Sequence, residues 1–155
     1  MRLDQIFKIE FLSESLLSNT KADVLAELIN VLIASGLKID RAKAIDVLQQ
    51  REKLGSTGIG DGVAIPHGKV SELHELVVAF GRSRQGIAFD AIDGKPVHLF
   101  FLLLAPENST GQHLKALAKI SKMLKTPNFR KKLIDAKTGS DLFKAIVEQD
   151  ESCPV

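Results

Sequence analysis

The spacing of apolar residues along the chain predicts helices in two blocks, separated by a region of extended segments. Between Thr20 and Gly36 the apolar positions recur at helical spacing, with a hydroxyl residue before the run and a glycine after it. Asp40 has the same capping role for a second helix. The predicted helices are 20–36, 40–53, 109–124, a short helix that starts at 126 and a last helix that starts at 138.

Short apolar runs between the helical blocks predict a sheet. The run 97–104 is almost continuously apolar, which is typical of a central strand covered on both faces. Weak alternation over 3–12 predicts a short strand, or a segment that leads into the first helix. The other predicted strands are 63–65, 76–80 and the short run 87–89. We therefore expect one α/β domain over 1–155, with a core of about 16–148, a polar and frayed tail from Asp150, and a mixed four- to five-stranded sheet flanked by helices on both faces.

Composition narrows the function classes. The net charge is +2, with mixed signs along the chain, and the sequence has no Trp and no Tyr, so a nucleic-acid surface is not expected. Cys153 is the one cysteine, which excludes an intrachain disulfide and fits a reducing compartment. The start of the chain lacks the apolar run of a signal peptide, and the run 97–105 is too short to span a bilayer. These features predict a cytoplasmic protein without membrane insertion.

The stretch 55–69 reads GSTGIGDGVAIPHGK and holds five of the eleven glycines. Glycine allows positive φ and a close approach of the backbone to a ligand. The short run 63–65 then leads to His67, whose imidazole is a nucleophile near neutral pH and can form a phosphoramidate. The competing interpretation is a histidine satisfied within a turn. Because the glycine loop lies beside it, we favour the reactive histidine, with backbone N–H groups available to phosphate oxygens.

Two further residues have the right chemistry for a phosphoryl group, although each also has a structural interpretation. His113 lies in the first turn of a helix, where anions are favoured, but it is also compatible with a surface position. Arg51 follows the buried stripe of the second helix and could bind phosphate with two hydrogen bonds. A cation at the end of a helix is stabilised there in any case, so position alone favours a structural role for Arg51.

Other ligand classes have weaker support. His74 lies among charged residues and is expected in solvent, and His98 begins an apolar strand and is expected as a polar group of the core or of a strand edge. The four histidines lack the spacing of a zinc site, so no metal and no cofactor is predicted. The glycines from Gly58 to Gly62 match neither the P-loop nor the dinucleotide fingerprint.

The stretch 51–70, REKLGSTGIGDGVAIPHGKV, resembles the active-site signature of the enzyme IIA proteins of the bacterial phosphotransferase system. The resemblance is to the fructose/mannitol class, most closely to its nitrogen-regulatory branch, and it covers about 16–148. It implies the fold of the phosphotransferase/anion transport proteins. It also implies phosphorylation of His67, with His113 and Arg51 stabilising the phosphoryl group. The neighbouring loop residues are carried as candidate phosphate contacts: Ser56, Thr57, Gly58 and Gly68.

The function that this resemblance implies is a phosphohistidine carrier, a phosphotransferase that accepts its phosphoryl group from an HPr-like phosphocarrier (NPr) and signals by its phosphorylation state. Its regulatory targets would be transporters or sensor kinases, and the protein itself a monomer or weak dimer. Two alternatives stay open. One is a sugar-specific IIA component that passes phosphate to a IIB domain. The other is a non-catalytic module that binds its targets whatever the state of His67.

Overall fold

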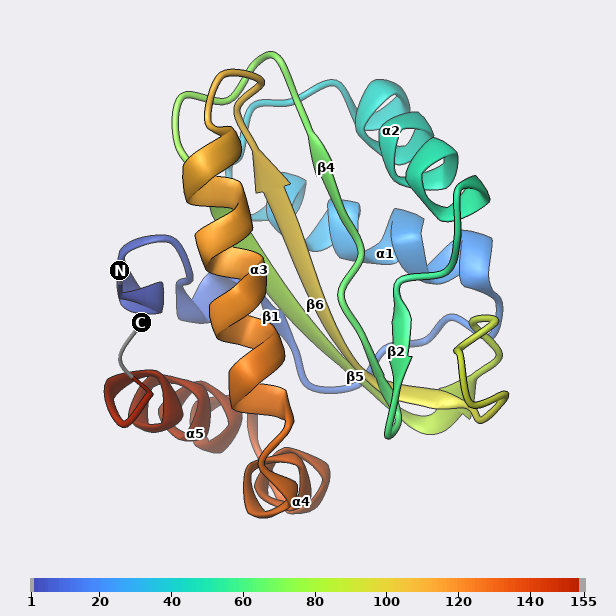
Figure 1. Ribbon diagram of the computed structural model, residues 1–155, viewed down its shortest axis with the longest axis vertical. Helices are drawn as coiled ribbons and strands as arrows, with labels where there is room; N and C mark the ends of the chain where they lie inside the picture. Colours follow the sequence, from blue (N-terminus) through green and yellow to red (C-terminus); the bar gives the residue numbers. More distant parts are fainter. Residues whose placement is uncertain (1, 154–155) are drawn as a thin grey trace.

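The computed structural model describes residues 2–153, which form a single α/β domain with one mixed sheet (Figure 1). The strands pair in the order β1-β5-β6-β3-β2, and β4 also pairs with β6. Antiparallel pairing joins β5 to β6 and β2 to β3, whereas β1–β5, β3–β6 and β4–β6 are parallel. The strands are β1 Leu12–Ser13, β2 Gly58–Gly60, β3 Val63–Ala64, β4 His67–Lys69, β5 Val77–Ile87 and β6 Val97–Ala105.

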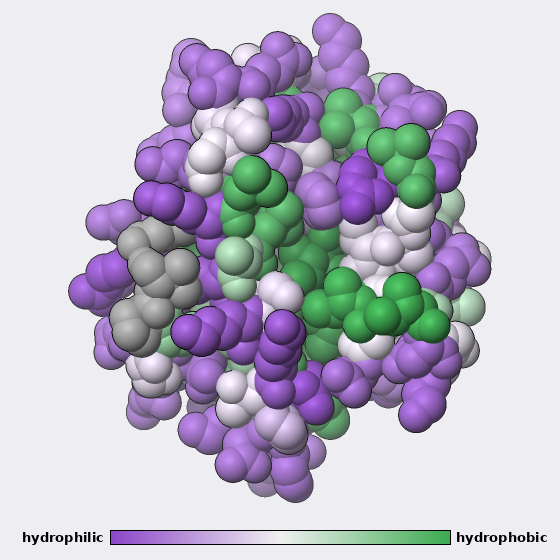
Figure 2. Space-filling view, viewed as in Figure 1, coloured by the Kyte–Doolittle hydropathy of each residue, from purple (hydrophilic) through white to green (hydrophobic). Residues whose placement is uncertain are grey.

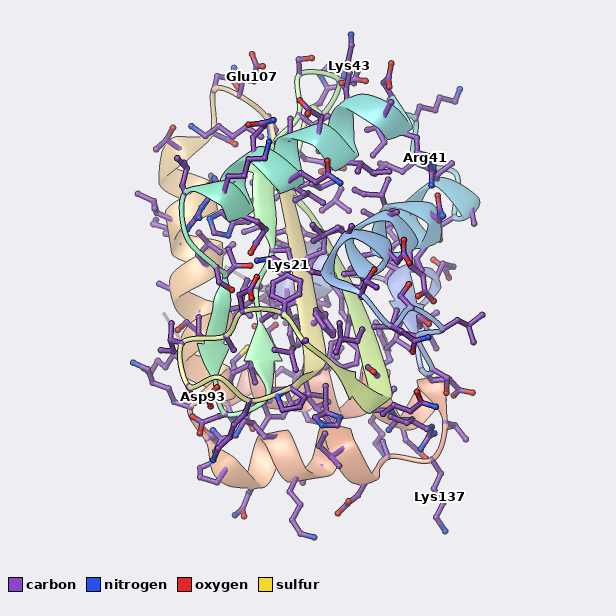
Figure 3. All side chains as sticks on the ribbon, turned by 90° about the vertical axis from the view of Figure 1, so that its right-hand side faces the viewer. Lys21, Arg41, Lys43, Asp93, Glu107 and Lys137 are labelled. Carbon is purple, nitrogen blue, oxygen red and sulfur yellow. The ribbon has the colours of Figure 1, made fainter. Side chains whose placement is uncertain are left out.

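Helices cover both faces of the sheet, as predicted (Figures 1 and 3). The helices α1 and α2 pack on one face, and α3, α4 and α5 pack on the other. The central strand β6 contributes to both cores, because its alternate side chains point to opposite faces. The bounds are α1 Lys21–Ala34, α2 Arg41–Lys53, α3 Thr110–Leu124, α4 Pro127–Asp135 and α5 Gly139–Glu151.

Three of the five predicted helix starts are confirmed by capping bonds, whereas Ser109 and Thr126 precede α3 and α4 without a side-chain capping bond. The hydroxyl of Thr20 accepts from Asp23 N at 3.1 Å, that of Thr138 accepts from Asp141 N at 3.1 Å, and the Asp40 carboxylate accepts from Lys43 N at 3.0 Å. Gly36 ends the first helix with φ of 99°, a left-handed conformation that favours glycine. Polar caps were therefore reliable guides to where helices begin.

Three features differ from the sequence-based expectations. The sheet has six strands, because four of them are pieces of only two or three residues that the apolar pattern does not separate. The segment 3–12 forms two short 3-10 turns, η1 Leu3–Gln5 and η2 Ile9–Phe11, ahead of β1. β5 continues to Ile87, so the run 87–89 is not a separate strand; Phe89 is buried outside the strand.

The packed core extends beyond the predicted limits of about 16–148. Leu3, Phe7 and Cys153 are buried in the same cluster as α3, α4 and α5. Asp150 was expected in a frayed tail, but it lies within α5 and its side chain is buried. Its carboxylate accepts from Leu3 N at 2.8 Å, so the two ends of the described chain are joined.

A break in the sheet positions the predicted nucleophile. β3 and β4 pair with the same edge of β6, Ala64 opposite Phe100 and His67 opposite Leu103. Ile65 and Pro66 interrupt them, and Pro66 has no N–H to give to a ladder. The Pro66 carbonyl still accepts from Leu103 N at 2.9 Å, so the chain stays against β6 across the break. His67 therefore begins β4 in a fixed register, between α2 and α3 (Figure 1).

Candidate active site

Three predicted residues from three elements meet at the start of β4. Arg51 comes from the last turn of α2, His67 from the first position of β4 and His113 from the first turns of α3. The Nε of Arg51 lies 3.3 Å from Nε2 of His67. The rings of His67 and His113 meet edge to face, with centroids 5.4 Å apart. The fold thus brings together side chains 62 positions apart in sequence, since 113 − 51 = 62.

Hydrogen bonds to both nitrogens of His67 determine its tautomer. Nδ1 lies 2.8 Å from the carbonyl oxygen of Ile65, and a carbonyl only accepts, so Nδ1 carries the proton. Nε2 is then the nitrogen with the free electron pair, and the Arg51 Nε–H donates to it. Nη1 of Arg51 donates to the Gly55 carbonyl at 2.9 Å, which holds the guanidinium beside the loop. The arrangement leaves Nε2 as the one ring nitrogen of His67 that could act as a nucleophile.

His113 has an unmet hydrogen-bonding need beside this nucleophile. Its side chain is buried, yet its Nε2 has no hydrogen-bond partner among the described residues. Buried polar atoms normally have a partner, and those without one deserve an explanation. A phosphoryl group on the neighbouring His67 would supply one. α3 also directs its N-terminal end, where anions are stabilised, toward this region.

The environment favours neutral rings for both histidines. Burial is the main cause that lowers the pKa of His67, and the charge of Arg51 adds to it, while the Ile65 hydrogen bond and the charge of Glu52 oppose it. The pKa of His113 is lowered by burial, then by the charges of His67 and Lys69. A neutral imidazole keeps the electron pair that a nucleophile needs.

The glycine loop is tightly held, but its hydroxyls are directed into the protein. Ser56 Oγ donates to the Phe89 carbonyl at 2.7 Å and accepts from Gly58 N at 3.0 Å. The buried Thr57 hydroxyl donates to the carboxylate of Glu52. The bonds of Ser56 and Thr57 hold the loop, and a phosphate contact by either hydroxyl would have to replace them.

The two glycines predicted as loop contacts are positions of close packing. A Cβ on Gly58 would lie 2.9 Å from Ala91, and a Cβ on Gly68 would overlap the Val47 side chain of α2. Gly68 thereby lets α2, and with it Arg51, lie directly against β4. The contribution of Gly68 that the structure shows is the approach of this helix.

The remaining histidines lie apart from this group. His74 is exposed, and His98 is half-buried with Nδ1 2.9 Å from the Ser83 carbonyl. Within residues 2–153 no three His, Cys, Asp or Glu side chains are grouped so that they could hold a metal ion. Over the same residues, no helix is both long and apolar enough to cross a membrane.

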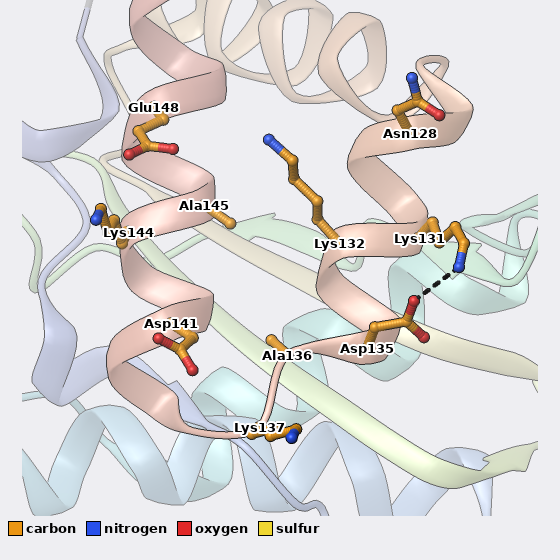
Figure 4. Close-up of a pocket in the computed structure, with 10 residues that line it drawn as sticks. All are labelled: Asn128, Lys131, Lys132, Asp135, Ala136, Lys137, Asp141, Lys144, Ala145 and Glu148. Carbon is orange, nitrogen blue, oxygen red and sulfur yellow. Dashed lines mark hydrogen bonds and ion pairs between the residues drawn. The ribbon is translucent and has the colours of Figure 1, made fainter.

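A groove of about 790 Å³ lies between α4 and α5 (Figure 4). Its polar lining mixes both signs of charge, and Lys131 Nζ already pairs with Asp135 at 3.0 Å. The charged side chains are the cations Lys131, Lys132, Lys137 and Lys144 and the anions Asp135, Asp141 and Glu148. None of them is buried, which describes a solvated surface rather than a built site.

Comparison with known proteins identifies the family of the chain. The family model described as "Phosphoenolpyruvate-dependent sugar phosphotransferase system, EIIA 2" matches residues 5–149. The chain belongs to this family. The resemblance inferred from the stretch 51–70 is confirmed, and with it the phosphotransferase-system class of the protein.

Relatives of this EIIA chain carry both regulatory and sugar-specific names. A nitrogen regulatory protein of Bradyrhizobium diazoefficiens is 39% identical over 94% of this chain and 95% of its own length. A fructose-specific EIIABC component of Bacillus subtilis is 32% identical over 97% of this chain, but the chain spans only 24% of that protein. The crystal structure of nitrogen regulatory protein IIA-Ntr from Neisseria meningitidis superposes with a TM-score of 0.85 at 35% identity, covering 93% and 98% of the two chains.

Sequence reasoning missed two residues that contact the EIIA site. The Glu52 carboxylate accepts hydrogen bonds from the backbone N–H and the hydroxyl of Thr57 in the glycine loop. Lys69 Nζ donates to Thr110 Oγ1 at 2.8 Å in the first turn of α3. Glu52 lies directly after Arg51 in the signature, and Lys69 follows His67 by two positions, on the same side of a strand. Their spacing from the predicted residues was the only available signal.

Proposed function

We propose that this EIIA protein is a phosphohistidine carrier that accepts a phosphoryl group on Nε2 of His67 from an HPr-like phosphocarrier and signals through its phosphorylation state. The observation that carries the proposal is the pair of bonds on His67. The Ile65 carbonyl holds the proton on Nδ1, which leaves Nε2 as the reactive nitrogen beside Arg51. The nitrogen-regulatory relatives support a regulatory role. The proposal places this role in the cytoplasm, with transporters or sensor kinases as the targets.

The transfer step exchanges one N–P bond for another. As Nε2 of His67 attacks in line, its electron pair forms the new bond to phosphorus, and the donor histidine leaves with the electrons of the old bond. The Arg51 N–H, which covers Nε2 at rest, shifts to a phosphoryl oxygen. Nε2 of His113 makes a hydrogen bond to another oxygen, and the Ile65 carbonyl stabilises the positive charge that develops on the His67 ring.

The surface around the site suits a protein donor. Figure 2 shows apolar side chains gathered on the face that carries α3, β2 and β4. Leu54 after α2, Ile59 in β2 and Leu114 beside His113 are all exposed. Exposed apolar groups around a polar centre are typical of protein–protein interaction surfaces. A donor that docks on these residues would bring its phosphohistidine to His67.

The test uses phosphoenolpyruvate, enzyme I and an HPr-type carrier with the intact protein. We expect an acid-labile phosphate on the wild type and none on His67→Ala. His113→Ala and Arg51→Ala should retain labelling at a rate lower by about 10²-fold, the usual cost of one charge-stabilising donor. Labelling that survives His67→Ala would refute the site. His98→Ala serves as the control, because His98 is a histidine of comparable burial away from the site.

The fructose-specific relatives support a second candidate, a IIA component that passes phosphate to a IIB domain. They include a fructose-specific EIIA component of Haloferax volcanii, 37% identical over 83% of this chain and 86% of its own length. The two functions differ after the first transfer. Rapid loss of phosphate from labelled protein to the cysteine of a IIB domain would favour sugar uptake. Stable labelled protein, with binding to a target that depends on the state of His67, would favour regulation.

A further inference from the structure

Glu52 is a buried carboxylate next to the site that the transfer step does not use. Its side chain is 6% exposed, and its Oε1 pairs with Lys21 Nζ at 3.0 Å. The same carboxylate accepts two bonds from one loop residue, from Thr57 N at 3.0 Å and from the Thr57 hydroxyl. Lys21 begins α1, so this carboxylate joins α1, α2 and the glycine loop. The Glu52 carboxylate therefore fixes the position of Thr57 through two hydrogen bonds.

From Thr57 the connection continues to the nucleophile through the backbone. The Thr57 carbonyl accepts from Ile65 N at 3.0 Å, and the Ile65 carbonyl is the group that holds Nδ1 of His67. Ile65 lies in the break between β3 and β4, where the sheet does not fix it by regular pairing. Its N–H is held by Thr57, which Glu52 holds in turn, while the Pro66 carbonyl that follows it accepts from Leu103 N.

We propose that Glu52 is a positioning residue for phosphoryl transfer, which acts through Thr57 and Ile65 to hold the His67 ring with its proton on Nδ1 and Nε2 free. The proposal rests on the function proposed above and deepens it. A carboxylate has acceptors for the Thr57 N–H, the Thr57 hydroxyl and the Lys21 ammonium together. Glutamine offers one oxygen in place of two, so Glu52→Gln should loosen this connection without changing the size of the side chain.

Two readouts test the proposal on the intact protein. Nitrogen-15 NMR of the His67 ring reports the tautomer, whether or not phosphoryl transfer takes place. Wild type should show a single Nδ1–H form, and Glu52→Gln a mixture of tautomers. In the carrier assay the maximal rate of Glu52→Gln should fall about tenfold or more, since small misplacements of reacting groups cost up to about 10²-fold. The KM for the carrier should change less than about twofold, because the docking surface is untouched.

Two pairs of variants separate positioning from general stability. Thr57→Val removes the hydroxyl and should lower the maximal rate, whereas Thr57→Ser keeps it and should restore the rate. Glu72→Gln is the matched control, because Glu72 accepts from Asp40 N at 2.7 Å at the other end of the same helix. It should change neither tautomer nor rate.

The outcomes are distinct. A wild-type tautomer in folded Glu52→Gln, or a raised KM with an unchanged maximal rate, would overturn the positioning role. A mixed tautomer with the slower transfer supports it. If wild-type protein takes no phosphate on His67, the proposed function fails, yet the NMR comparison still decides whether Glu52 sets the tautomer. Should Glu52→Gln fail to fold, the Thr57→Val and Thr57→Ser pair decides, by tautomer and by rate.

Discussion

At the scale of single residues, the site is built to keep two imidazoles neutral near a cation. Burial lowers the pKa of both His67 and His113, and the positive charges of Arg51 and Lys69 act in the same direction, each on its nearer ring. Protonation would remove the electron pair of Nε2 and place a cation beside the guanidinium. The structure therefore favours the form that can attack phosphorus.

These lowered pKa values predict how stability depends on pH. Each ring binds a proton more readily in the unfolded chain, where the pKa is about 6.5, than in the folded protein. The free energy of unfolding should thus be highest above about pH 6.5 and decline as the pH falls toward the lowered pKa values of the two rings. Chemical denaturation at a series of pH values measures this, and His67→Gln/His113→Gln should flatten the decline. An equal decline in the double variant would contradict the assignment.

Removing the charge of Lys69 tests what sets the pKa of His113. Lys69→Met removes a cation that lowers the pKa of this ring, so the pKa should rise, as measured by NMR titration. The length of the side chain is nearly kept, although the bond to Thr110 is lost. Lys125→Met is the control, since Lys125 follows the far end of α3. An unchanged pKa in Lys69→Met would show that the charge of Lys69 does not contribute to the lowered pKa of His113.

How much of the site could be predicted differs between residues. His67 was predicted both from the loop beside it and from the signature, whereas Arg51 and His113 were assigned to the site by the resemblance, because their positions alone left a structural role open. Glu52 was not predicted, since a carboxylate at a helix end is ordinarily solvated, and only the fold shows that Thr57 and Lys21 enclose it. The tautomer of His67 likewise depends on a backbone carbonyl, which carries no signal in a sequence.

At the scale of elements, the site depends on how closely α2 lies against β4. Gly68 has no side chain at the point where Val47 of α2 contacts the strand. The approach brings the last turn of α2 to His67, so Arg51 can reach Nε2. The packing of one helix on one strand therefore determines the distance between Arg51 and His67.

We predict that Gly68→Ala destabilises the protein and slows transfer together. The added methyl overlaps Val47, and such overpacking costs about 1–3 kcal/mol. Displacing α2 should also move Arg51 from His67 and lower the rate of phosphorylation. Val47→Ala makes room, so the double variant should recover much of both losses, as measured by urea unfolding and the carrier assay. Additive effects would show that the two residues are not in contact.

A buried arginine in β5 shows where the pattern of apolar residues fails to predict burial. Arg82 lies in β5 and is almost fully buried, a position that the pattern would assign to an apolar residue. Its guanidinium donates to the carbonyls of Glu14 at 3.0 Å and Leu133 at 2.9 Å, which joins β5 to the end of α4. Because those acceptors are backbone atoms of segments distant in sequence, no local sequence pattern predicts them.

At the scale of the whole molecule, a buried ion pair joins the two ends of the described chain to the helix that carries His113. Lys119 of α3 pairs with Asp150 of α5, and both side chains are almost fully buried. Asp150 also accepts from Leu3 N, which holds η1 against the same helices. The sequence predicted a frayed tail here because its local composition is polar, and only the closed fold places Asp150 opposite Lys119.

This pair leads to a prediction that separates stability from function. Asp150→Ala removes the carboxylate that Lys119 contacts, and removing one partner of a buried pair costs about 3–5 kcal/mol. Asp135→Ala is the matched control, because its partner Lys131 and Asp135 itself are exposed, and such pairs contribute little. Urea unfolding should therefore show a large loss of stability for Asp150→Ala and almost none for Asp135→Ala.

Since Arg51 and His67 lie on α2 and β4, away from α5, the folded fraction of Asp150→Ala should still accept phosphate on His67. Equal unfolding midpoints for the two variants would contradict the role of the pair, and loss of labelling in folded Asp150→Ala would show that α5 controls the position of His113 through α3.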